Sequence, residues 1–133
     1  MGRYVYENNE YVWKYEFAKQ ASEQCRIAEE FNIGHIRFFD YEDHLTLHIN
    51  DVEKLEKVLE EATDFELAVK ERDKAFEPYE KGIPFDVYDK IDAKAKENCN
   101  DIHFYRMIKA YIKHMKKEYE TNNREEFLFI GEY

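Results

Sequence analysis

Glycine, proline and cysteine are all scarce in this chain of 133 residues, which contains 4, 2 and 2 of them. With so few glycines, the chain has no glycine-rich loop that would hold a phosphate group. Its two cysteines, Cys25 and Cys99, lie in helical patterns and form no CxxC motif, so we expect reduced thiols and a cytoplasmic protein. Neither cysteine has a histidine beside it in the sequence, and no GxSxG motif occurs. We therefore expect no cofactor, and we lean toward a protein that is not an enzyme.

Long apolar runs are absent as well. No stretch approaches the ~18 apolar residues of a membrane-spanning helix, and the chain does not begin with a charged segment followed by an apolar one. We expect neither a membrane span nor a signal peptide. Basic residues are outnumbered, 20 to 30, and the formal net charge is −10. This charge opposes attraction to nucleic acids and anionic membranes but permits binding to basic proteins, so direct nucleic-acid binding is not expected.

Aromatic residues, in contrast, are abundant and make up 17% of the chain. Residues 2–18 read as a hairpin that turns at Asn8-Asn9, because asparagine tolerates the positive φ of a two-residue turn. Counting back from the turn places Val5 opposite Val12, on a face that also carries Glu7. The other face is an aromatic stripe that we assign to the core: Tyr4, Tyr6, Tyr11, Trp13, Tyr15 and Phe17. The alternative is a stacking platform for bases, which the net charge opposes.

The chain is organised around a second hairpin at residues 35–50. A turn at Tyr41-Glu42 pairs Asp40 with Asp43 and places His35 opposite His48. Because strand side chains alternate between faces, one face is apolar and belongs to the core: Ile36, Phe38, Leu45, Leu47 and Ile49. The other face, which we name the histidine face, carries the candidate ligand-binding residues His35, Arg37, His44, Thr46 and His48, together with Phe39.

Helical patterns fill most of the remaining sequence. Ser22 is a candidate N-cap of a helix that ends at Gly34. Asn50 or Asp51 caps a longer helical pattern that kinks or restarts at residues 63–66 and closes before Pro78. A short helix begins at Asp86, a clean one runs from residue 101 to 122, and Glu126 to Ile130 read as a last strand.

These patterns predict an α+β fold in a single domain spanning residues 1–133. Its sheet is mostly antiparallel and consists of the two hairpins plus the C-terminal strand, with helices packed on one face. A ferredoxin-like variant is one way to arrange these elements.

The histidine face is open to three interpretations. Its imidazole, guanidinium and hydroxyl donors would suit a phosphate or nucleotide. Zinc also accepts imidazole ligands, but His44 and His48 lie about 13 Å apart along one strand and Arg37 opposes a cation, so we expect no metal. The third interpretation is the ordinary polar side of an antiparallel sheet.

One short motif on this face resembles a known family. His44-Leu45-Thr46-Leu47 matches the pattern HxTx and is similar to one half of the signature of the 2H phosphoesterases. That resemblance implies two such motifs facing each other, with each histidine as acid or base and each hydroxyl holding the phosphate. The second motif is missing here, because the segments beginning at His103 and at His114 both lack the hydroxyl residue at the third place.

Charge is distributed unevenly along the chain. Acidic residues outnumber basic ones from Asp51 to Lys81, and we predict partner contacts at Glu53, Glu56, Glu60 and Glu61. A basic stripe without acids, Arg106 to Lys117, lies beside the apolar seam of the last helix; we expect it to pack near the acidic helix, with contact to an acidic ligand or nucleic acid as the alternative.

The leading functional hypothesis is a small acidic protein that binds a basic protein partner as an inhibitor or adaptor. In composition the chain resembles phage-encoded antagonists of host defence or nucleic-acid enzymes, including DNA mimics. The alternative is a nucleotide- or anion-binding protein that sequesters or cleaves its ligand at the histidine face. The third is a plain assembly module.

Overall fold

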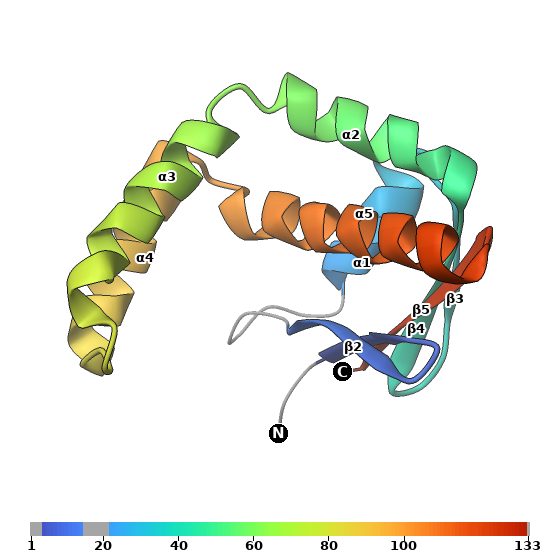
Figure 1. Ribbon diagram of the computed structural model, residues 1–133, viewed down its shortest axis with the longest axis horizontal. Helices are drawn as coiled ribbons and strands as arrows, with labels where there is room; N and C mark the ends of the chain where they lie inside the picture. Colours follow the sequence, from blue (N-terminus) through green and yellow to red (C-terminus); the bar gives the residue numbers. More distant parts are fainter. Residues whose placement is uncertain (1–3, 15–21, 133) are drawn as a thin grey trace.

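The computed structural model describes residues 4–14 and 22–132 (Figure 1). In this part of the chain, five antiparallel strands form one open sheet in the order β2-β1-β5-β4-β3. The strands are β1 (Tyr4–Glu7), β2 (Glu10–Lys14), β3 (His35–Phe38), β4 (Glu42–His48) and β5 (Glu126–Glu132). The helices are α1 (Ser22–Glu29), α2 (Val52–Glu61), α3 (Phe65–Phe76), α4 (Phe85–Asn98) and α5 (Ile102–Asn122), with short 3₁₀ turns at Ile49–Asp51 and Glu77–Tyr79.

The predicted α+β class and antiparallel sheet are confirmed. The C-terminal strand β5 lies between the two hairpins, next to β1 on one side and β4 on the other. This order differs from a ferredoxin-like sheet, in which the first strand of the βαββαβ unit is an inner strand. Here β2, the strand that leads into α1, is at the edge of the sheet.

The first hairpin turns as predicted, but the face that it buries is the opposite of the predicted one. Asn8 and Asn9 both have positive φ, at 53° and 65°. Beyond the turn the pairing slips by one residue, so that Val5 pairs with Trp13 and not with Val12. The slip brings Trp13 to the side of Val5, where it packs against the core. Val5 and Glu7 point into the core, while Tyr4, Tyr6 and Tyr11 lie on the opposite, partly exposed side. Tyr15 and Phe17 fall outside the described residues.

The second hairpin also differs in register from the prediction. Ile36 pairs with Leu45 and Arg37 with His44, a shift of two residues from the expected pairs. The turn lies at Asp40-Tyr41, closed by a hydrogen bond of 2.8 Å from the Phe39 backbone N–H to the Glu42 carbonyl oxygen. A shift of two keeps every side chain on its predicted face, because strand side chains alternate with a period of two.

Helix α1 ends at a different left-handed residue from the predicted one. Asn32, with φ of 55°, follows the helix, and the Ile33 N–H bonds back to the Ile27 carbonyl oxygen at 3.0 Å. Gly34 has a positive φ of 73° as well, and it has a second reason to be glycine. A Cβ there would lie 2.5 Å from the Thr46 carbonyl oxygen and from a methyl group of Leu47. The α1–β3 connection thus depends on a residue without a side chain.

The main core lies between the inner face of the sheet and the helices α1, α2 and α5. Helix α5 is the central element, and the predicted apolar seam is confirmed at most positions. Figure 1 shows α2 running alongside α5. Fully buried residues from the two layers meet here: Val5, Leu45, Leu47, Phe127 and Phe129 from the sheet, and Ile27, Leu55, Ile108, Tyr111 and Met115 from the helices.

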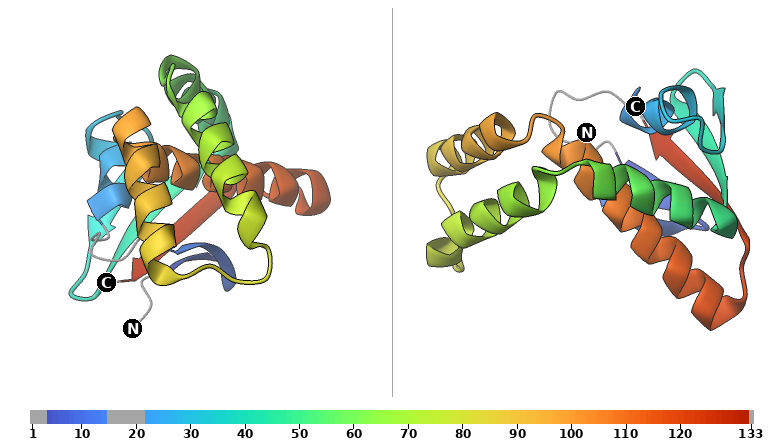
Figure 2. Two further views of the ribbon diagram at one scale, coloured as in Figure 1. Left: turned by 90° about the vertical axis from the view of Figure 1, so that its left-hand side faces the viewer. Right: turned by 90° about the horizontal axis from the view of Figure 1, so that it is seen from above.

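Helices α3 and α4 form an arm beside the start of α5 (Figures 1 and 2). Of the kink or restart expected at residues 63–66, the structure shows a restart, because α2 ends at Glu61 and α3 begins at Phe65. A smaller cluster joins the arm to α5: Phe65, Ala68, Ala95, Cys99 and Ile102. Burial raises the pKa of the Cys99 thiol to about 11, and Asp64 adds to the rise. Among the helices of residues 22–132, none is both long and apolar enough to span a lipid bilayer.

Candidate functional site

The structure brings the predicted ligand residues onto one side of the sheet. Because the register shift is even, His35, Arg37, His44, Thr46 and His48 share the face opposite the core. The cross-strand neighbours nevertheless differ from the predicted ones. His35 pairs with Thr46, not with His48, and Arg37 pairs with His44. The predicted His35–His48 pair is therefore wrong, and β3 and β4 place no two imidazoles directly opposite each other.

Two of the three histidines on this face already have partners inside the molecule. His44 Nε2 lies 2.7 Å from a carboxylate oxygen of Glu42, and the centre of its ring lies 4.5 Å from that of Phe39, with the two rings tilted by 45°. His48 Nδ1 accepts a hydrogen bond of 3.0 Å from the Asn50 backbone N–H and so caps the turn before α2. The expected caps, Asn50 and Asp51, do not cap α2 through their own side chains. Two of the histidines on this face therefore already make hydrogen bonds within the protein.

The second half of a 2H phosphoesterase motif does not assemble around His44. The remaining histidines, His103 and His114, both belong to α5 and lie on the core side of the sheet. His114 is buried, with 9% of its surface exposed. No histidine in residues 4–14 or 22–132 therefore faces His44 across a cleft.

The predicted partner-binding residues lie on the surface. Glu53, Glu56, Glu60 and Glu61 of α2 are all exposed. The basic stripe of α5 packs beside this helix, as expected, and Lys116 Nζ lies 3.0 Å from a carboxylate oxygen of Glu56. Most lysines of the stripe remain exposed.

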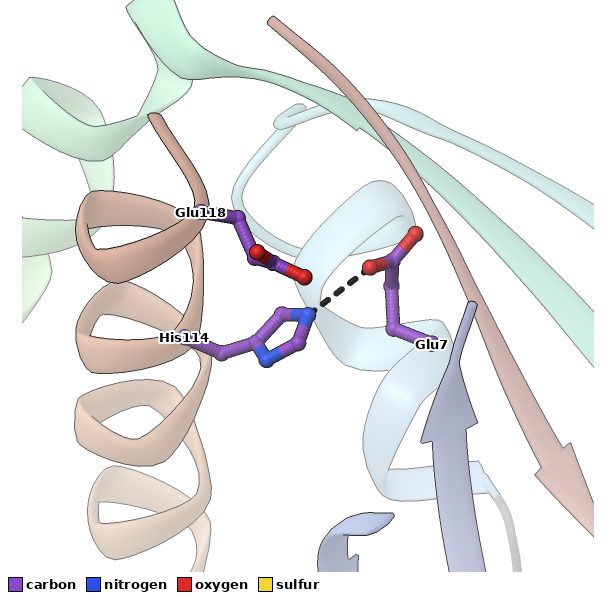
Figure 3. Close-up of side chains that lie close together, drawn as sticks. All are labelled: Glu7, His114 and Glu118. Atoms are coloured by element: carbon purple, nitrogen blue, oxygen red, sulfur yellow. Dashed lines mark hydrogen bonds and ion pairs between the residues drawn. The ribbon is translucent and has the colours of Figure 1, made fainter. Parts of the chain in front are cut away.

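A buried polar cluster that the sequence did not reveal connects β1 with α5 (Figure 3). His114 Nε2 lies 2.7 Å from Glu7 Oε1, and Glu118, one helical turn further along α5, points at the same space. Arg124, in the segment between α5 and β5, donates to both oxygens of Glu7 at 2.6 Å. It also reaches Glu118 Oε1 at 3.3 Å. We name Glu7, His114, Glu118 and Arg124 the internal ion cluster.

The bonds in this cluster decide the charge of Glu7. Burial by itself raises the pKa of this carboxyl group, because a charge in an apolar interior is poorly solvated. Hydrogen bonds from Arg124, from His114 and from the Leu128 backbone N–H outweigh burial and lower the pKa of Glu7 to about 2. The carboxylate in turn raises the pKa of Arg124 above its ordinary value. Glu7 is therefore a buried carboxylate that stays ionised at neutral pH.

The same cluster contains a possible ligand set for a metal ion. One ligand atom from each of Glu7, His114 and Glu118 lies within 4.8 Å of the others, and imidazole with carboxylates suits zinc or manganese. Both Glu7 oxygens, however, are occupied by the Arg124 guanidinium. A cation would have to displace a bidentate ion pair, so the arrangement is best explained as a neutralised link between β1, α5 and β5.

Sequence reasoning missed this cluster for two reasons. The aromatic side of the first hairpin was assigned to the core, so Glu7, on the other side, was placed in solvent. On α5 the 3-4 spacing predicts an apolar seam from Tyr105 to Tyr119; Tyr119 is however 43% exposed, while its neighbour Glu118 is 3% exposed. The spacing of His114 and Glu118, four residues apart on one helix, was the available signal.

Comparisons with known proteins add no relative. No protein-family model, no curated protein and no solved structure matches this chain.

Proposed function

We propose that this protein is a small binding protein, not an enzyme, that acts as an inhibitor or adaptor by engaging a basic protein partner. The observation that supports this most is the position of Glu53, Glu56, Glu60 and Glu61, which are all exposed on one helix. The buried carboxylates, by contrast, already bind groups inside the protein: Glu7 binds Arg124, and Asp43 accepts a hydrogen bond of 2.6 Å from Gln24. Surface acids are the ones available to a partner.

Electrostatics specify the kind of partner. A net charge of −10 steers a basic protein toward the surface and repels acidic ones. Among the glutamates of α2, Glu56 already pairs with Lys116 of α5. A basic partner therefore gains most from Glu53, Glu60 and Glu61. These three are the residues to change when the surface is tested.

Exposed aromatic side chains also favour a protein partner. The β3–β4 turn carries Phe38, Phe39 and Tyr41 with exposed fractions of 56%, 45% and 81%. Phenylalanine and tyrosine are enriched in protein interfaces, and clustered exposed rings mark interaction sites more often than isolated ones do.

The alternative function, anion or nucleotide binding at the histidine face, has weaker support. His44 and His48 already make hydrogen bonds inside the molecule. Only His35, Arg37 and Thr46 remain as exposed donors on that face.

The test is affinity capture from a lysate with three forms of the full chain. The first is wild type, the second carries Glu53→Lys, Glu60→Lys and Glu61→Lys, and the third carries Glu66→Lys, Glu77→Lys and Glu80→Lys. The control set changes the net charge equally at other exposed positions. The proposal predicts a basic protein that is retained by wild type and the control but lost by the α2 variant. Equal retention by all three forms, or no retained basic protein, would overturn it.

A further inference from the structure

A second polar cluster lies where the α3–α4 arm meets α5. Its centre is the carboxylate of Asp92 on α4, which is 6% exposed. Asp92 Oδ1 lies 2.6 Å from His103 Nε2 and 3.4 Å from Arg72 Nε. Arg72, on α3, is 8% exposed, and its Nη2 donates to the Tyr88 hydroxyl oxygen at 3.4 Å. Three helices thus contribute to one buried group of charges.

Arg106 on α5 extends this cluster. Its Nη1 lies 3.0 Å from His103 Nδ1. A guanidinium only donates, so Nδ1 must accept and the proton of a neutral imidazole is on Nε2, facing Asp92. The hydrogen bond to His103 is therefore a contact with a neutral group and does not itself neutralise the charge of Arg106.

No carboxylate in the described ranges pairs with Arg106 at ion-pair distance. Its guanidinium lies 5.3 Å from the centre of the Trp13 ring, and one of its five N–H donors is accounted for by His103. Burial lowers the pKa of Arg106 below its usual range and the positive charge of Arg72 lowers it further, while the more distant carboxylates of Asp73 and Asp92 offset only part of this. A half-buried guanidinium with no carboxylate at ion-pair distance is poorly solvated, which costs free energy. A bound anion would offset this cost by pairing with the guanidinium.

We propose that this junction binds a phosphate group, held by the guanidinium groups of Arg106 and Arg72, with the Tyr88 hydroxyl as a further donor. Phosphate suits the site better than a single carboxylate does. It carries up to two charges, and its oxygens match the planar fork of arginine. Solvent reaches the site at two of these side chains, because Tyr88 is 38% exposed and Arg106 is partly exposed. This site is separate from α2 and does not depend on the proposed partner binding.

The experiment is a titration of the full-length protein with inorganic phosphate at constant ionic strength, followed by two-dimensional amide and indole NMR spectra. Binding should shift the Trp13 indole signal, and phosphate should bind more tightly than acetate. Arg106→Gln should weaken phosphate binding at least tenfold. Lys109→Gln is the matched control, because it removes one positive charge from an exposed position three residues along the same helix; it should bind as wild type does.

Tyr88→Phe provides a second variant that keeps the ring and removes the hydroxyl donor, and it should weaken binding several-fold. A parallel titration with adenosine monophosphate tests whether the site recognises free phosphate or a nucleotide. An affinity equal to that of inorganic phosphate indicates recognition of the phosphate group alone, and a higher affinity indicates that the adenosine also makes contact. The proposal is overturned if the Trp13 signal does not move in wild type. It is also overturned if Arg106→Gln binds phosphate as Lys109→Gln does.

Discussion

Glu7 is the single residue on which the interior depends most. Its carboxylate receives two hydrogen bonds from Arg124, one from His114 and one from the Leu128 backbone N–H. These donors come from α5, from the segment after it and from β5, so one side chain ties the N-terminal hairpin to the C-terminal end of the chain. A carboxylate that is 2% exposed is tolerated only because every oxygen is occupied.

Glu7→Gln tests this role directly. The change leaves the Arg124 guanidinium without its charged partner, and breaking a buried pair in this way costs about 3 kcal/mol. Urea unfolding followed by circular dichroism gives the free energy of unfolding. Glu120→Gln, at an exposed position on α5, is the control and should change it by less than about 0.5 kcal/mol. Equal effects of the two substitutions would show that the internal ion cluster contributes nothing measurable.

The lowered pKa of Glu7 also predicts how stability depends on pH. The folded-state pKa of about 2 lies below the ordinary value of 4.5, so the unfolded chain takes up this proton first as pH falls. The stabilisation is complete above pH 4.5 and is lost between pH 4.5 and about 2. The difference in unfolding free energy between wild type and Glu7→Gln should therefore shrink over that range. A difference that stays constant from neutral pH down to about pH 2.5 would contradict the assignment.

At the scale of elements, the two hairpins show what sequence patterns can and cannot fix. Most helices, the two hairpins and the final strand are predictable, because hydrophobic periodicity and turn residues mark them. Register is less certain. In β3–β4 the error is two residues, so every side chain keeps its face and the histidine face survives. In β1–β2 the pairs of Tyr6 and Glu7 are as predicted, and the error is the choice of the buried face: the aromatic side was assigned to the core, so Glu7 was placed outside. The bulge near Val12 shifts only the pairs beyond it, and no local residue pattern predicts it.

The α1–β3 connection gives a prediction at the same scale. Gly34→Ala should destabilise the protein by more than Gly82→Ala, although both residues have positive φ. At Gly34 the new methyl group meets the Thr46 carbonyl oxygen, whereas at Gly82 nothing lies within 4 Å. Backbone strain costs about 1 kcal/mol at either site, and the clash at Gly34 adds about 1 to 3 kcal/mol. Comparison of the two melting temperatures checks this, and equal temperatures would refute the close approach of β4.

At the scale of the whole molecule, acidic and basic residues are distributed differently over the surface. Negative charge dominates overall, at −10, while the basic residues Lys109, Lys113, Lys116 and Lys117 gather on the exposed side of α5. Helix α2 lies beside that stripe, and yet only Glu56 has an ion pair with it in the described residues. The other glutamates of α2 remain available, which is why the proposed partner surface is placed there.

The most direct test of the proposed function is the salt dependence of partner binding. The dissociation constant of the captured basic protein is measured by calorimetry at low and at physiological ionic strength. We predict that wild type loses affinity steeply as salt rises. The variant with Glu53→Lys, Glu60→Lys and Glu61→Lys should bind weakly with little salt dependence, and the variant with Glu66→Lys, Glu77→Lys and Glu80→Lys should stay close to wild type. An α2 variant that binds as tightly and with the same salt dependence as wild type would contradict the central claim.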